Sequence, residues 1–167
     1  LVDPNRRYQD RDNYVWIQDA DKNGLVVGTQ ARIFYQDAMS RTRIALKFNE
    51  MVRNGEIGPV MLGRDHHDVS GTDSPFRETS NIKDGSNIMA DMATQCFAGN
   101  AARGMTMIAL HNGGGVGIGK SINGGFGMVL DGSKRVDEIL WQAMPWDVMG
   151  GVARRAWARN PHSIVER

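Results

Sequence analysis

Short apolar runs alternate along this chain with longer segments in which apolar residues recur at helical spacing. The apolar runs predict buried strands at 31–35, 60–62, 105–110 and 128–130. Helical spacing predicts helices over about 40–54, 85–103, 131–143 and 152–159. Short strands that alternate with helices are typical of a mostly parallel sheet covered by helices. We therefore predict an α/β fold with a mostly parallel sheet flanked by helices.

Several residues predict where these elements begin and end. Ser40 is a plausible N-cap for the first helix, and Asn54-Gly55 should close it. Pro145 should stop the helix that starts near residue 131, because proline lacks the N–H that a helix interior needs. Residues 14–20 fit either a short helix or a strand. The polar, aperiodic residues before them predict an N-terminal arm or linker over 1–30, followed by one domain over 31–167.

Composition excludes some classes of protein. The 167 residues have a net charge of +1, which gives no electrostatic case for binding nucleic acid or an anionic membrane. No apolar run approaches the length that spans a bilayer, and the first residues do not resemble a signal peptide. The single cysteine, Cys96, cannot form an internal disulfide, which either favours a reducing compartment or is uninformative about it. It lies in a helical pattern where a cysteine is usually a core residue rather than a nucleophile.

A charged loop follows the apolar run at 60–62 and is the first candidate site. Residues 63–79 carry eight ionisable side chains and almost no apolar ones. A long connection without secondary structure is usually functional or disordered, and turn-like Gly and Pro positions argue against disorder here. Its carboxylates and arginines would suit a general acid or base beside an anion clamp, or equally a salt-bridge network that holds the loop. Its adjacent histidines lack the spacing of a metal site, so we expect no metal.

A glycine-rich stretch after residue 110 is the second candidate site. Gly114 to Ser121 matches the phosphate-binding pattern G-x-x-x-x-G-K-S, which leaves a P-loop nucleotide-binding domain as the alternative function. A P-loop lysine opens a helix, however, and residues 122–127 are too rich in glycine to propagate one. The G-x-G-x-x-G dinucleotide fingerprint is also missing from this stretch.

Three ordered motifs resemble the urocanase family, and more closely its eukaryotic branch. They are the sequences RDHHDVSGTDSPFRET at 64–79, KDGS at 83–86 and HNGGGVG at 111–117. The resemblance extends from Ala31 to Arg155. It implies that the chain is the C-terminal part of a urocanase core domain, from which the inserted NAD-binding domain is absent.

The resemblance also implies an activity. Urocanases are hydro-lyases that add water to urocanate and give 4-imidazolone-5-propionate in histidine degradation. They hold NAD+ tightly and use it as an electrophile, not as a hydride carrier. Members are usually cytoplasmic homodimers. The remaining urocanase segments would be needed to complete the active site, so we expect the piece alone to be inactive.

The family motifs carry roles to individual residues. Arg77 matches the position expected to hold the substrate carboxylate, with Thr79 as a second substrate-binding residue. Asp65 and His66 match the Asp-His pair near the imidazole, where proton transfer is required. The resemblance places Gly113, Gly114 and Gly115 against NAD+.

One position departs from the bacterial pattern. Bacterial members carry a cysteine in the Ala-Arg-Ile-Cys strand, and this chain has Phe34 there. A phenylalanine cannot act as a nucleophile or an acid, so a cysteine-dependent mechanism does not transfer to this chain. Cys96 is not at the motif position and does not replace it.

Overall fold

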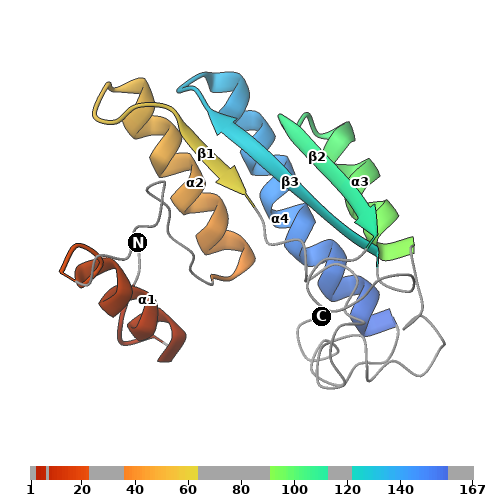
Figure 1. Cartoon of the computed structure of the whole chain (residues 1–167), viewed down its shortest axis with the longest axis horizontal. Coiled ribbons are helices and arrows are strands. Elements are labelled where there is room, and N and C mark those ends of the chain that lie inside the picture. The colour runs from red at the N-terminus through yellow and green to blue at the C-terminus, as the bar shows by residue number, and fades with distance from the viewer. Residues whose placement is uncertain (1–2, 7, 23–35, 64–90, 113–121, 158–167) are drawn as a thin grey trace.

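The computed structural model describes residues 3–6, 8–22, 36–63, 91–112 and 122–157. In chain order, the elements are α1 (Tyr8–Gln18), α2 (Ala38–Arg53), β1 (Val60–Gly63), α3 (Asp91–Ala102), β2 (Met107–Asn112), β3 (Ile122–Leu130) and α4 (Lys134–Trp157). Helices α2, α4 and α3 lie against one face of a small sheet, and α1 lies beside α2 (Figure 1). Helices and strands thus share one layered core, which confirms the α/β class. The predicted strand at 31–35 lies outside the described residues.

The three described strands form an antiparallel sheet in the order β1-β3-β2. Val60 of β1 faces Leu130 of β3, and Met107 of β2 faces Gly127 of β3. The prediction of a mostly parallel sheet is therefore wrong for these strands. Residues 113–121 connect β2 to β3 and are too few for the helical crossover that neighbouring parallel strands require. Strand β3 returns beside β2 in the opposite direction instead.

Strand β3 is longer than the sequence pattern predicts. Its apolar part at 128–130 was the expected strand, but pairing begins at Ile122, inside the glycine-rich stretch. Glycine is a poor strand former by itself. Here residues 122–127 of β3 pair with β2, and residues 127–130 pair with β1, so tertiary pairing outweighs the weak local preference.

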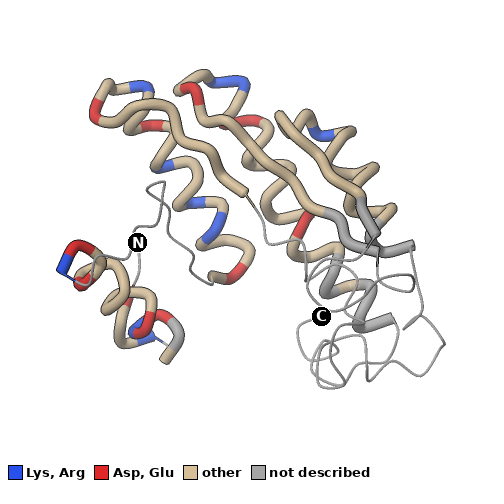
Figure 2. Tube along the Cα trace, viewed as in Figure 1, with Lys and Arg blue, Asp and Glu red and all other residues tan. Residues whose placement is uncertain are grey.

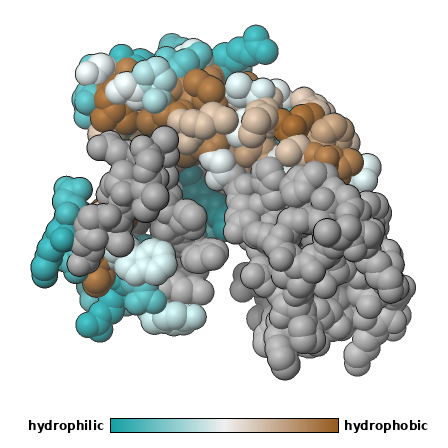
Figure 3. All heavy atoms as spheres, viewed as in Figure 1, coloured by the Kyte–Doolittle hydropathy of each residue, from teal (hydrophilic) through white to brown (hydrophobic). Residues whose placement is uncertain are grey.

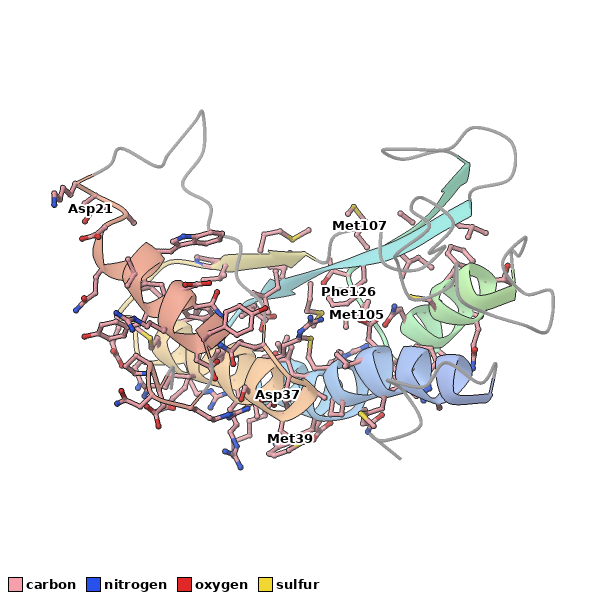
Figure 4. The ribbon with its side chains drawn as sticks, turned by 90° about the horizontal axis from the view of Figure 1, so that it is seen from below. Asp21, Asp37, Met39, Met105, Met107 and Phe126 are labelled. Carbon is pink, nitrogen blue, oxygen red and sulfur yellow. The ribbon has the colours of Figure 1, made fainter. Side chains whose placement is uncertain are left out.

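Alternate residues of β3 build the core. Phe126, Met128 and Leu130 are buried on the face that meets the helices. Leu130 and Leu140 of α4 are completely buried, and burial of a side chain of this size contributes about 1.5–3 kcal/mol. Figure 4 shows Phe126 and Met105 between the sheet and the helices, whereas Met107 lies on the opposite side of the sheet. The remaining core residues are Ala45, Val136, Ala143 and Met144.

The other face of the sheet is not covered by the described helices. Met61, Met107 and Val129 point to this side and are exposed. The three strands contain no Lys, Arg, Asp or Glu, and Figure 2 shows the described charges on the helices and turns. Brown and tan spheres, interrupted by paler ones, lie over this part of the molecule in Figure 3.

The N-cap of helix α2 lies three residues earlier in the chain than predicted. Its N-cap is Asp37, whose Oδ1 accepts a hydrogen bond from the Ser40 N–H at 2.8 Å, so the prediction of Ser40 as the cap is wrong. Burial acts to raise the pKa of Asp37, but the Ser40 N–H, the Arg6 guanidinium and the Ser40 hydroxyl outweigh it and lower that pKa to about 2. The helix ends before Asn54 and Gly55, as predicted.

The N-terminal region contains a helix. Residues 8–18 form α1, so this part of the expected arm is helical. Polar contacts join it to the start of α2. The Gln36 side chain donates to Asp10 Oδ1 at 2.8 Å, and Arg6 pairs with Asp37. Asp10 is buried in this contact, with 2% of its surface exposed.

Helix α4 continues through Pro145 to Trp157, so the predicted stop at proline and the separate last helix are both wrong. Proline removes the hydrogen bond to the carbonyl of residue 141 and weakens the helix at that point. Packing compensates on both sides. Ala143 and Met144 are buried in the core just before the proline, and Asp147 is buried against α3 just after it.

Candidate functional site at one end of the sheet

Both candidate segments leave the sheet in the same direction. Strand β1 ends at Gly63, directly before the charged loop, and β2 ends at Asn112, directly before the glycine run. Because both strands are antiparallel to β3, they run parallel to each other on its two sides. Their carboxyl ends therefore point toward the end of the sheet where β3 begins, as Figure 1 shows.

The pairing register gives the spacing between the two strand ends. Gly63 pairs with Gly127, whereas Asn112 pairs with Ile122. The end of β2 thus lies about 17 Å further along β3, at roughly 3.4 Å per residue.

The predicted site residues themselves lie outside the described residues. This applies to Asp65, His66, Arg77 and Thr79 of the charged loop and to Gly113, Gly114 and Gly115 of the glycine run. Their roles stay predictions. What the structure does describe is the scaffold to which both segments are attached.

Helix α3 connects the two candidate segments. It starts at Asp91, separated by eleven residues from the end of the charged loop at 79, and leads through a turn at Gly104 into β2, which precedes the glycine run. In the chain, α3 and β2 thus lie between the charged loop and the glycine run.

The opposite end of the sheet is held by a hydrogen-bond network around the buried side chain of Asn49 on α2. Its Oδ1 accepts from the Gly132 N–H at 2.8 Å, and its Nδ2 donates to Ser133 O at 2.9 Å and to Asp137 Oδ1 at 2.7 Å. Arg53 donates to Gly132 O at 2.6 Å and pairs with Asp137. These bonds fix the turn between β3 and α4 to α2, so the sheet is anchored at the end away from the candidate segments.

A second polar cluster lies between α3 and α4. Asn100 Nδ2 donates to Asp147 Oδ1 and to Cys96 Sγ, each at 3.2 Å, and Cys96 Sγ donates to Asp147 Oδ1 at 3.4 Å. Asn100 is completely buried and Asp147 is 6% exposed. The Oδ1 atom of Asn100 is buried without a hydrogen-bond partner in the described part of the chain.

Beside this cluster, Trp146 packs closely on α3. A Cβ at Gly99 would lie 1.9 Å from the Trp146 ring, so only glycine allows this approach. The Arg103 guanidinium lies 4.1 Å from the centroid of the same ring. Arg103 also donates to Gly99 O at 3.0 Å, which holds its side chain along the helix.

The sequence interpretation missed the polar cluster. It placed Cys96 on an apolar helix face and gave no role to Asn100 or Asp147. The sequence feature that could have indicated the cluster is the spacing of Cys96 and Asn100, which are four residues apart and share one face of a helix. Asp147 could not be added, because its place opposite α3 depends on the continuation of α4 through Pro145.

The described residues do not support the P-loop alternative. A strand, β3, follows Ser121 where a P-loop needs a helix. Within the described ranges, no three His, Cys, Asp or Glu side chains come together to hold a metal ion. None of the helices in these ranges combines the length and apolar character needed to cross a membrane.

Comparison with known proteins gives the family. Residues 5–166 match the family model described as the urocanase C-terminal domain. The chain belongs to the urocanase family. The match covers nearly the whole chain, so it includes both candidate segments and all the described helices and strands.

Named relatives agree with this assignment. The chain is 58% identical over 156 residues to urocanate hydratase of Mus musculus and 56% identical over 155 residues to that of Homo sapiens. It is 51% identical over 163 residues to a probable urocanate hydratase of Dictyostelium discoideum. These matches cover 93%, 92% and 97% of this chain, but 23%, 23% and 24% of the relatives. The chain thus spans about a quarter of the length of the curated relatives it matches.

Proposed function

We propose that this chain is part of a urocanate hydratase, a hydro-lyase that adds water to urocanate to give 4-imidazolone-5-propionate in histidine degradation. The observation that carries the proposal is the urocanase match over residues 5–166. Relatives named urocanate hydratase that are 56–58% identical to the chain support the same reaction. The arrangement of the strands is compatible with it, since the charged loop and the glycine run follow strand ends that point to one end of the sheet.

In this proposal the charged loop binds and orients urocanate. The guanidinium of Arg77 forms a planar pair of hydrogen bonds with the substrate carboxylate, and the Thr79 hydroxyl supports it. Asp65 and His66 follow β1 closely and handle the proton transfers near the imidazole ring. Attachment to the paired strand β1 restricts where these two side chains can lie.

The glycine run is proposed to contact NAD+. Gly113, Gly114 and Gly115 directly follow β2, and consecutive glycines offer main-chain N–H groups that no side chain shields. This donor set fits a polar or anionic part of a dinucleotide. When bound, NAD+ supplies an electrophilic ring that makes hydration of the substrate feasible. The chain's own contribution is to orient urocanate against it and to exclude bulk water.

The proposal extends to the whole protein. Residues 31–167 would form the C-terminal part of the core domain, with residues 1–30 leading into it. The remaining urocanase segments would complete the NAD+ site, and the protein would act as a cytoplasmic homodimer. Size-exclusion chromatography with light scattering tests the dimer directly.

The test of the function is urocanate turnover by the protein at its natural length. Loss of the ultraviolet absorbance of urocanate is followed for the wild-type protein and for the Arg77→Lys variant. Lysine keeps the charge but loses the two-pronged geometry, so we expect a large rise in KM without loss of thermal stability. Arg43→Lys, at an exposed position on α2, is the matched control and should leave turnover unchanged.

Three results would count against the proposal. No loss of absorbance in the wild-type protein with NAD+ bound would remove urocanate as substrate. An equal fall in affinity and thermal stability in Arg77→Lys would show that Arg77 supports the fold instead of the substrate. Binding of a nucleoside triphosphate by the wild-type protein that is lost in Lys120→Ala would favour the P-loop alternative.

A further inference from the structure

Helix α1 carries its polar and apolar side chains on unusual sides. Asp10 and Asn13, which are three residues apart on one side of the helix, are 2% and 3% exposed. Four consecutive residues in its second half, 14–17, are apolar or aromatic, and each is 38–51% exposed. A helix on the surface of a folded domain usually buries its apolar side and exposes its polar side. In α1 the described buried side chains are polar, and the apolar ones face outward.

The contacts described between α1 and the start of α2 are polar. The Gln36 side chain, just before α2, donates to Asp10 Oδ1 at 2.8 Å, and Arg6 Nε lies 3.7 Å from Asp10 Oδ2. Arg6 also pairs with Asp37, the N-cap of α2. These contacts involve the first half of α1 and the residues before it. They use none of the apolar side chains at 14–17.

Ile17 shows how little of the second half of α1 is covered. It follows Asp10 by seven residues and Asn13 by four, so it lies on the same side of the helix as these buried residues. Ile17 is nevertheless 49% exposed, and the neighbouring Trp16 is 51% exposed. This chain therefore leaves the second half of α1 partly uncovered even on the side that is buried in the first half.

The exposed patch at 14–17 has the composition of a protein interface. Residues 13–18, NYVWIQ, contain no Lys, Arg, Asp or Glu, whereas Arg11, Asp12 and Asp19 on either side are charged. Interfaces usually have a core depleted in charge inside a polar rim, and tryptophan and tyrosine often anchor them. A single exposed apolar residue needs no explanation, but four in a row indicate a surface that another part covers.

The family comparison indicates what covers this patch. The match to the urocanase C-terminal domain begins at residue 5, so α1 belongs to that domain. This chain corresponds to 23% of the Mus musculus and Homo sapiens relatives, so the larger part of such a polypeptide precedes the C-terminal domain. Helix α1 is the first described element of the domain and lies beside α2, outside the layers formed by the sheet and the other helices (Figure 1). It is thus the described element nearest in the chain to the preceding polypeptide.

We propose that residues 14–17 of α1 form a docking surface for the polypeptide that precedes this domain in the natural-length protein. Trp16 and Ile17 are its anchors, and the occupant is an uncharged, apolar surface of the same polypeptide. The polar contact of Asp10 with Gln36 joins α1 to the start of α2, so docking onto α1 places the preceding part relative to the core. The proposal concerns the assembly of the protein and goes beyond the proposed reaction.

Hydroxyl-radical labelling of the natural-length protein tests whether the patch is covered. The labelling of each tryptophan is measured by mass spectrometry as a fraction of its value in urea-unfolded protein. Trp141 on α4 is the matched control for radical dose, since it is 53% exposed against 51% for Trp16. We expect the fraction for Trp16 to be about one tenth or less, because anchors in an interface core are fully desolvated. A fraction for Trp16 that matches its 51% exposure in this chain would overturn the proposal.

Photo-cross-linking of the natural-length protein identifies what covers the patch. A benzophenone amino acid in place of Trp16 puts a photoreactive ring in the patch, and the same replacement of Trp141 is the control on α4. We expect a cross-link within one molecule, from position 16 to the preceding polypeptide. A cross-link to a second copy, a cross-link only to residues 23–35 or another part of this chain, or no cross-link in folded protein would overturn the proposal. Neither readout uses urocanate turnover, so failure of this proposal and failure of the proposed function are distinguishable.

Discussion

The side chain of Asn49 offers the sharpest test of how the sheet is anchored. It is completely buried and makes three hydrogen bonds, with Gly132 N, Ser133 O and Asp137 Oδ1. Asn49→Ala removes all three and leaves the buried Gly132 N–H without its acceptor. At about 1 kcal/mol net for each bond, we expect the free energy of unfolding to fall by roughly 2–4 kcal/mol.

The Asn49 variants are compared by urea unfolding of the natural-length protein, and by amide exchange at Gly132. Asn49→Asp keeps the acceptor for Gly132 but loses both donated bonds and faces Asp137 with a second carboxylate. It should therefore destabilise the protein at least as much as Asn49→Ala does. Glu50→Ala, at the next and exposed position, loses only a surface ion pair with Lys47 and should change stability by about 0.5 kcal/mol or less.

Small effects of the Asn49 substitution on stability and on amide exchange would refute the anchoring role of this network. Suppose the free energy of unfolding of Asn49→Ala differed from that of the wild-type protein by less than about 0.5 kcal/mol, against roughly 1 kcal/mol expected for each lost bond. The network would then not anchor the turn. Unchanged exchange at Gly132 would point to the same conclusion. A fall in stability in Asn49→Ala together with an equal fall in Glu50→Ala would show a general effect on α2 instead.

Three further predictions concern the same scaffold. Gly132→Ala, at φ +84°, adds a Cβ 2.9 Å from the Arg53 backbone and should lower the free energy of unfolding by about 2–3 kcal/mol. Gly55→Ala, at φ +72°, adds a Cβ in open space and should lower it by about 1 kcal/mol through backbone strain alone. Urea unfolding of both variants separates the steric clash with Arg53 from backbone strain. Equal losses of stability in the two variants would show that the clash contributes nothing. Asp37→Asn should lower stability by about 1 kcal/mol above pH 4 after allowance for solvent screening, because the pKa of Asp37 is lowered to about 2 in the folded protein. That difference should disappear as the pH falls from about 4 through about 2, and a difference independent of pH would contradict the assignment to the charge. Leu140→Ala should cost about 2–5 kcal/mol in thermal unfolding, against less than about 1 kcal/mol for Val129→Ala on the exposed face.

The site could be predicted only in part from the sequence. The urocanase motifs located the charged loop and the glycine run, because long ordered strings of polar residues and glycines identify a family without any structure. The structure adds that the strands before them, β1 and β2, run in the same direction on either side of β3. The sequence interpretation did not find Asp147, since its partner Asn100 lies on another helix, far away in the chain.

Local patterns determined where helices and strands exist. Apolar periodicity identified α2, the described part of α3, and the strands at 60–62 and 128–130, because side-chain spacing reflects which face is buried. Tertiary structure alone decided how these elements combine. Pairing with β2 drew glycines 124 and 125 into β3, and packing on both sides of Pro145 kept α4 continuous. A short connection made β2 and β3 antiparallel neighbours. In the glycine and proline cases, contacts between residues distant in the chain outweighed a local preference of about 1–3 kcal/mol.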